Sequence, residues 1–133
     1  MRQIHAALAL CVFTGAAMAQ DLAPLTDLKA CRLDSELVSL SFSYEGGSCE
    51  QTGDASADLR DNATATATVP IVSTAEVCTM QAVTVEHSGA VAVPADVTAL
   101  DVQLVSPGGE VQATGNVDIA PNSPDCAPPV PRE

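Results

Sequence analysis

Apolar and polar residues alternate along much of the chain, and this period of two predicts strands, whose successive side chains point to opposite faces. The clearest stretch, residues 37–44, alternates serine with four large apolar side chains: Val38, Leu40, Phe42 and Tyr44. The segment Glu45–Ser48 follows directly, and its two adjacent glycines favour a turn. We therefore expect a strand with one buried face over residues 37–44 and a turn at its end.

Residues 63–70 alternate alanine or valine with threonine, which predicts a second strand with small buried side chains. We place this strand near a sheet edge, because Pro70 cannot donate a backbone hydrogen bond to a neighbouring strand. Residues 71–86 carry apolar side chains on both parities, a pattern typical of a strand that is buried on both faces or contains a bulge. Residues 50–62 are polar and have no period, and we interpret them as a solvated loop.

The sequence SPGG at residues 106–109 separates two alternating stretches and predicts a β-hairpin. Alternating apolar side chains stand on both sides of this turn: Leu100, Val102 and Leu104 before it, Val111 and Ala113 after it. A last short strand is expected at residues 117–119.

Short strands separated by turn sequences, with no long helical period, predict an all-β domain over residues 37–120. We expect a small antiparallel β-sandwich, immunoglobulin-like or similar. Residues 20–36 lead into this domain, and the spacing of their leucines permits a short helical turn or an irregular segment. Five of the eleven residues from Pro121 to Pro131 are proline, which predicts an extended C-terminal tail over residues 121–133.

The N-terminal residues 1–19 have the parts of a secretory signal peptide: Arg2, an apolar stretch, and the triplet Ala17–Met18–Ala19. We expect cleavage before Gln20. The apolar stretch is shorter than the roughly 20 residues of a membrane-spanning helix, so we expect a soluble mature chain that is periplasmic or secreted, with a cleavage site of bacterial type. The alternative, lipid attachment at Cys11, would place the bulky Leu10 where a small residue is expected.

Four of the five cysteines belong to the expected mature chain: Cys31, Cys49, Cys78 and Cys126. An even number of cysteines in an exported protein favours two disulfides, and their wide spacing does not fit a metal site, which typically has close pairs. Three connectivities are possible, and we favour Cys31 with Cys126 and Cys49 with Cys78. Two bridges would stabilise a domain that has few aromatic core residues, since the whole chain contains two Phe, one Tyr and no Trp.

Charge narrows the choice of partner. The chain has 17 acidic and 5 basic residues and a net charge of −12. Nucleic acids and anionic membranes bind clustered basic side chains, so we expect neither as a partner, and no membrane span. A basic envelope or extracellular protein fits this charge.

Few residues of the chain are suited to catalysis. His87 is the only histidine of the expected mature chain, and we interpret it as an exposed residue of a turn. The sequence has no nucleophile motif, so we predict a protein that is not an enzyme and has no catalytic residues, no cofactor and no metal. The carboxylates of one polar segment are the candidate ligands for calcium, although their spacing matches no calcium-binding loop: Glu50, Asp54, Asp58 and Asp61.

These features predict an exported, acidic, non-catalytic binding or structural module of the cell envelope or extracellular space. Loops on a rigid β domain commonly carry recognition, and we expect contacts at residues 45–48 and 106–110. The alternative is a secreted or periplasmic enzyme inhibitor, such as a protease inhibitor, which uses the disulfide-anchored loop at residues 45–50. A hydrolase would require a second titratable group beside His87.

Overall fold

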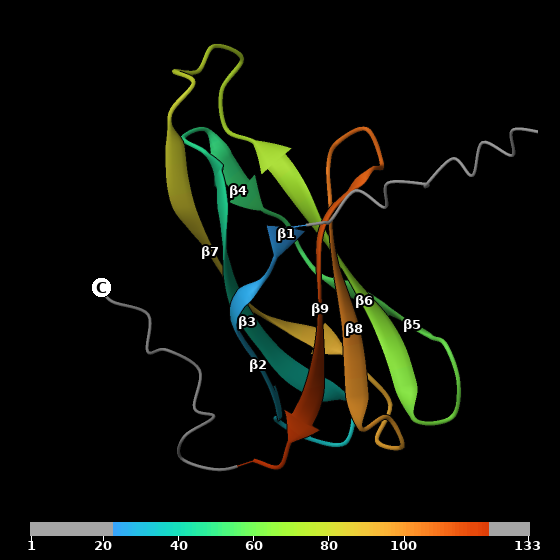
Figure 1. Ribbon diagram of the computed structural model, residues 1–133. Coiled ribbons are helices and arrows are strands. Elements are labelled where there is room, and N and C mark those ends of the chain that lie inside the picture. The colour runs from blue at the N-terminus through green and yellow to red at the C-terminus, as the bar shows by residue number, and fades with distance from the viewer. Residues whose placement is uncertain (1–22, 123–133) are drawn as a thin grey trace, which may run out of the picture.

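The computed structural model of the chain describes residues 23–122, which form strands and no helix (Figure 1). This confirms the all-β class. The strands are β1 (Ala23–Pro24), β2 (Thr26–Arg32), β3 (Leu37–Gly47), β4 (Glu50–Thr52), β5 (Ser56–Leu59), β6 (Thr64–Ser73), β7 (Ala82–Ala92), β8 (Ala99–Val105) and β9 (Val111–Ala120).

The strands pair into one sheet with the order β4-β6-β8-β9-β2-β3-β7, and β5 and β1 add to β6 and β9. The sheet curves until β7 approaches β4 and β5, so that its shape is that of a nearly closed barrel (Figure 1). A hydrogen bond of 2.7 Å between the Thr52 hydroxyl and His87 Nδ1 crosses this seam. A sandwich of two separate sheets is therefore not confirmed, because backbone pairing continues without a break from β4 to β7.

The antiparallel part of the prediction needs correction, because some neighbours are parallel. Strand β6 runs parallel to β8, and the N-terminal strands β1 and β2 run parallel to β9. The cause is the path of the chain. After β6 it crosses to pair with β3 as β7, and it then returns to β6 as β8 in the same direction as β6.

The core lies inside the barrel, and the predicted alternation supplies most of it. On β3, β6 and β8 every second side chain is buried: Val38, Leu40, Phe42 and Tyr44, then Ala65, Ala67, Val69 and Ile71, then Leu100, Val102 and Leu104. Burial of aliphatic side chains stabilises a fold by about 1.5 to 3 kcal/mol each. The small residues of β6 contribute less, since alanine has little surface to bury.

Three segments differ from the sequence-based expectation. Residues 26–32 form β2 and not a helical turn, and the polar residues 50–62 contain β4 and β5 in place of a continuous loop. Residues 71–86 are not one doubly buried strand, because β6 ends at Ser73 and an exposed loop separates it from β7. Strand β6 is also not an edge strand, since it has neighbours on both sides.

Pro70 fits inside this sheet because the neighbouring strand is interrupted opposite it. Strands β4 and β5 flank β6 on the same side but leave a gap at residues 53–55. At this gap the Gly53 N–H donates to the Pro70 carbonyl at 2.8 Å. Because proline has no N–H, only one backbone hydrogen bond is lost at this position.

The disulfide between Cys49 and Cys78 is confirmed. The predicted signal peptide, the Cys11 alternative, Cys126 and nearly all of the predicted tail lie outside the described residues, so the pairing of Cys31 with Cys126 stays a prediction. Between residues 23 and 122 there is no helix with the length and apolar character that crossing a membrane requires.

Candidate binding cavity

The two segments in which the sequence predicts contacts meet at one end of the barrel. The end of β3 and the β8–β9 turn enclose a cavity of about 380 Å³. It is lined by Tyr44, Glu45, Gly46, Glu50, Ile71, Leu104, Ser106, Pro107, Glu110, Gln112 and Ala113. Figure 1 shows this turn at the upper end of the molecule, the same end at which β3 finishes and β6 reaches its C-terminus.

The β8–β9 turn is held by its own hydrogen bonds. Ser106 N–H donates to the Glu110 carbonyl at 2.8 Å, and Gly109 N–H donates to the Ser106 carbonyl at 2.9 Å. Gly109 has φ +90°, a conformation that side-chain-bearing residues rarely adopt, so glycine is required at this position. The turn therefore gives Pro107 and Glu110 a fixed position at the cavity.

The charges of the cavity are all negative. Three glutamates line it, Glu45, Glu50 and Glu110, and no lysine or arginine does. Two arginines of the described chain are engaged elsewhere. Arg32 donates to the carbonyls of Val93, Pro94 and Val97 at 2.7 to 2.9 Å, and Arg60 pairs with Asp101. The carboxylates of the cavity thus have no basic side chain of the described residues beside them.

Tyr44 brings a buried hydroxyl to this cavity. The side chain is 5% exposed, and its hydroxyl lies beside the Glu50 carboxylate without a hydrogen bond of good geometry to any described residue. Burial, and after it the nearby Glu50 carboxylate, raise the pKa of Tyr44 to about 12. The phenol is therefore neutral at physiological pH.

A smaller hollow of about 210 Å³ adjoins the cavity and shares Glu50, Ile71 and Pro107 with it. The Cys49–Cys78 disulfide lines this hollow and connects the turn after β3 to the loop at residues 74–81. The Ser48 hydroxyl adds a hydrogen bond of 3.0 Å to the Thr79 carbonyl. These links tie the exposed loop to the cavity end of the barrel.

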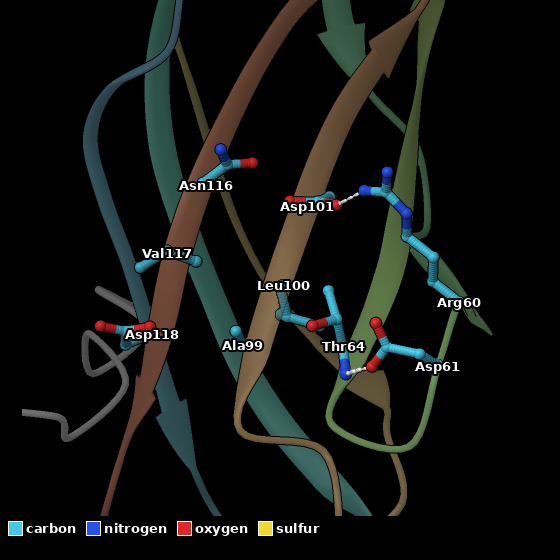
Figure 2. A pocket seen from close by; sticks show the side chains of 9 residues that line it. All are labelled: Arg60, Asp61, Thr64, Ala99, Leu100, Asp101, Asn116, Val117 and Asp118. Atoms are coloured by element: carbon cyan, nitrogen blue, oxygen red, sulfur yellow. Dashed lines mark hydrogen bonds and ion pairs between the residues drawn. The ribbon is translucent and has the colours of Figure 1, made fainter.

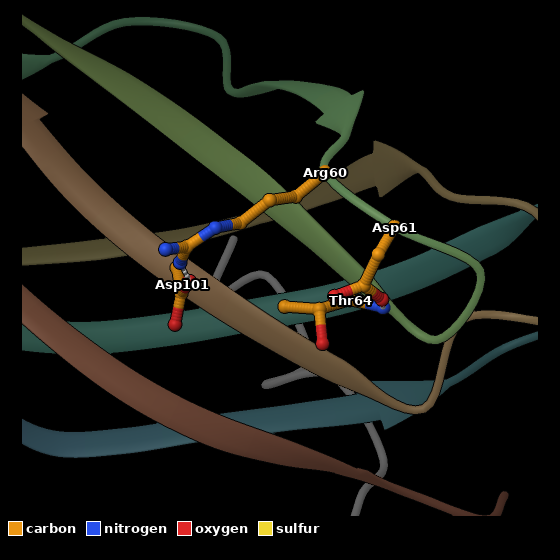
Figure 3. A network of polar contacts seen from close by, with 4 residues as sticks. All are labelled: Arg60, Asp61, Thr64 and Asp101. Carbon is orange, nitrogen blue, oxygen red and sulfur yellow. Dashed lines mark hydrogen bonds and ion pairs between the residues drawn. The ribbon is translucent and has the colours of Figure 1, made fainter.

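A larger and shallower hollow of about 500 Å³ lies over the outer faces of β6, β8 and β9, and two of its three acids, Asp61 and Asp101, are already partnered (Figure 2). Arg60 pairs with Asp101, and the Asp61 carboxylate accepts the Thr64 N–H group at 2.8 Å (Figure 3). The same carboxylate accepts the Ala63 N–H group at 2.8 Å. Those N–H groups hold the pKa of Asp61 below its usual value. This arrangement closes the loop before β6, and we assign it a structural role.

The candidate calcium ligands do not come together. Glu50 lines the cavity, Asp54 lies between β4 and β5, Asp58 is exposed on β5, and Asp61 closes the loop before β6. Over residues 23–122 no three acidic, histidine or cysteine side chains converge as a metal site requires.

The interpretation of His87 as an exposed turn residue is wrong. It lies within β7 and is 6% exposed, and its ring stacks on Phe42 with centroids 5.0 Å apart. Its Nδ1 contacts the Thr52 hydroxyl, while Nε2 has no hydrogen-bond partner among the described residues. Burial lowers its pKa, and the Asp54 carboxylate offsets only part of this effect. The alternation Val85–His87 along β7 is the one signal that could have indicated an inward histidine.

No protein-family model, no curated protein and no solved structure matches this chain. The function is therefore best inferred from the cavity itself.

Proposed function

We propose that the protein is an exported, non-catalytic module that binds a basic envelope or extracellular protein through the cavity at residues 45–50 and 106–113. The supporting observation is that two segments distant in sequence enclose one cavity that has three glutamates and no basic side chain. Electrostatic complementarity favours a positively charged partner and speeds its association.

Export is supported by the signal-peptide pattern of residues 1–19 and by the Cys49–Cys78 disulfide. Disulfides form and persist in oxidising compartments such as the periplasm and the extracellular space. We include the bridge between Cys31 and Cys126 in the proposal, since Cys31 is buried at the barrel wall.

Capture from envelope extract tests the function when two variants with equal charge are compared. The variant Glu45→Gln/Glu110→Gln removes two charges at the cavity, and Glu36→Gln/Glu86→Gln removes two exposed charges elsewhere. We expect the wild type and the Glu36/Glu86 variant to retain the same basic protein at low salt, and the cavity variant to lose most of it. Equal capture by all three proteins would contradict the proposal.

The alternative, an enzyme inhibitor, gains support from a different loop than the one expected. Residues 45–47 belong to β3, whereas residues 74–81 form an exposed loop that is anchored by Cys78. Val77 and Met80 on this loop are 88% and 106% exposed. Stoichiometric inhibition of one member of a protease panel, lost on Met80→Asp substitution, would favour the inhibitor over the binding module.

A further inference from the structure

We propose that the cavity receives one arginine or lysine side chain of the partner, with its charged group between Glu50 and the Tyr44 hydroxyl and its methylene groups along the apolar wall. This inference rests on the proposed function and adds the chemistry of the group that is recognised.

The Tyr44 hydroxyl is the first reason. A buried hydroxyl without a hydrogen-bond partner is costly, because the group has lost water and gained nothing in exchange. Tyr44 is 5% exposed and lines the cavity, and its hydroxyl lies beside the Glu50 carboxylate without a hydrogen bond of good geometry. The N–H groups of a guanidinium or ammonium group can donate to its oxygen. Because the pKa of Tyr44 is raised to about 12, this phenol offers a neutral acceptor at physiological pH.

The position of Glu50 is the second reason. The Glu50 carboxylate lies directly over Gly46, where a β-carbon would stand 2.6 Å from Glu50 Oε2 and 2.8 Å from Tyr44 Cε2. Only a residue without a β-carbon allows this approach. The absence of a β-carbon at this position therefore gives the carboxylate room beside the tyrosine ring, where a cation could contact both groups.

The inner wall of the cavity is the third reason. The apolar residues among those that line the cavity are Ile71, Leu104, Pro107 and Ala113. Lysine and arginine bury their methylene groups along such apolar surface while they keep the charged end at polar groups. A bare metal ion would not use this wall, and no three potential ligands converge among the described residues.

The experiment is a titration of the mature, oxidised protein with n-butylguanidinium and n-butylammonium, followed by NMR of the backbone amides. n-Butanol serves as the uncharged control. We expect saturable shifts at residues 44–50 and 106–113 with at least one of the two cations and none with n-butanol. The cation that binds more tightly identifies the preferred side chain, arginine or lysine.

Two variants test the assigned contacts. Tyr44→Phe keeps the ring and removes the hydroxyl, and Glu50→Gln keeps the shape and removes the charge. Each should weaken binding of the preferred cation by about tenfold, as expected for the loss of a hydrogen bond to a charged group. Glu36→Gln, at an exposed site elsewhere, should bind as the wild type does. An amide spectrum that retains the wild-type dispersion shows that each variant is folded.

Three results would overturn the inference: no saturable shift with either cation, equal binding of n-butanol, or undiminished binding by folded Tyr44→Phe. Its failure can be told apart from failure of the proposed function. Cation binding without capture of a basic protein leaves the subsite standing and removes the function. Capture that depends on Glu45 and Glu110, combined with unchanged cation binding by Tyr44→Phe, removes the subsite alone.

Discussion

Strands β6, β8 and β9 bury only apolar side chains, whereas β3, β4 and β7 bring Tyr44, Thr52 and His87 to the interior. The polar contacts of the first group lie on the outside, where Asp101 of β8 pairs with Arg60 and the Asp61 carboxylate, in the loop before β6, accepts backbone N–H groups. The second group leaves the Tyr44 hydroxyl and His87 Nε2 without hydrogen-bond partners among the described residues.

This difference separates polar groups that hold the fold from polar groups that are available to a ligand or respond to pH. A carboxylate that already accepts backbone N–H groups or pairs with arginine has little left to offer a partner. The three glutamates of the cavity have no such partner among the cavity's lining residues. Changes in the two halves should therefore have different consequences for stability and for binding.

The largest loss of stability is expected when the disulfide is removed. This disulfide lies on the side of the barrel formed by β3, β4 and β7. The double variant Cys49→Ser/Cys78→Ser removes a bridge between residues that are 29 positions apart in sequence. A loop of this size predicts a loss of about 2 to 4 kcal/mol in the free energy of unfolding, measured by urea denaturation. Hydrogen exchange should show a larger loss of protection at residues 45–50 than at residues 99–105.

A control isolates the bridge itself. Ser48→Ala removes the neighbouring hydrogen bond to Thr79 and leaves the disulfide in place, so its effect on stability should be much smaller. If hydrogen exchange increased equally in both halves of the barrel, the disulfide would have no additional local effect at residues 45–50 and the contrast between the halves would fail.

The next effect is a dependence of stability on pH that originates from His87. Burial lowers the pKa of His87 from its ordinary value of 6.5, so the unfolded chain binds a proton more readily than the folded one. Above pH 6.5 the free energy of unfolding has its full value with respect to His87. It decreases as the pH falls below 6.5, by no more than about 1.4 kcal/mol per pH unit. Urea denaturation between pH 5 and pH 8 measures this slope.

The variant His87→Gln provides the comparison for this slope. Glutamine cannot titrate but can still hydrogen-bond to Thr52 across the seam. We expect its stability to vary less between pH 7 and pH 5 than that of the wild type. An identical pH dependence in the two proteins would mean that another group, and not His87, is responsible.

The alternation of apolar and polar residues correctly predicted the strands in which every second side chain is buried. It failed where a bulge or another local irregularity shifts this alternation. Strand β2 is an example, because its pairing with β3 shifts register after Thr26 and Asp27 has φ +52°. The leucines around this bulge therefore stand at a spacing that resembles a helix. The short strands β4 and β5 are polar and form only by pairing with β6, so the sequence carries no local sign of them.

The candidate site was predicted in part. Turn-forming residues indicated the segments at residues 45–48 and 106–110, but their meeting depends on pairing between strands that are distant in sequence. Val77 and Met80 are exposed apolar side chains, and they contributed to the wrong prediction of one buried strand over residues 71–86. Sequence alone does not show which apolar residues lie inside. The unpartnered hydroxyl of Tyr44 follows from three-dimensional packing and could not be predicted from the sequence.

The smallest expected effect is on the melting temperature, which should change in opposite directions when two different carboxylates are removed. Asp61→Ala removes the acceptor of two backbone N–H groups and should lower the melting temperature. Since these N–H groups hold the pKa of Asp61 below 3.8, its contribution is present above that pH and is lost as the pH falls through the lowered value. Glu110→Gln removes a charge that faces two other glutamates and should leave the melting temperature unchanged or slightly higher at low salt. Thermal denaturation of both variants at low and high salt measures the difference, and a lower melting temperature for Glu110→Gln would show that this carboxylate stabilises the fold as Asp61 does.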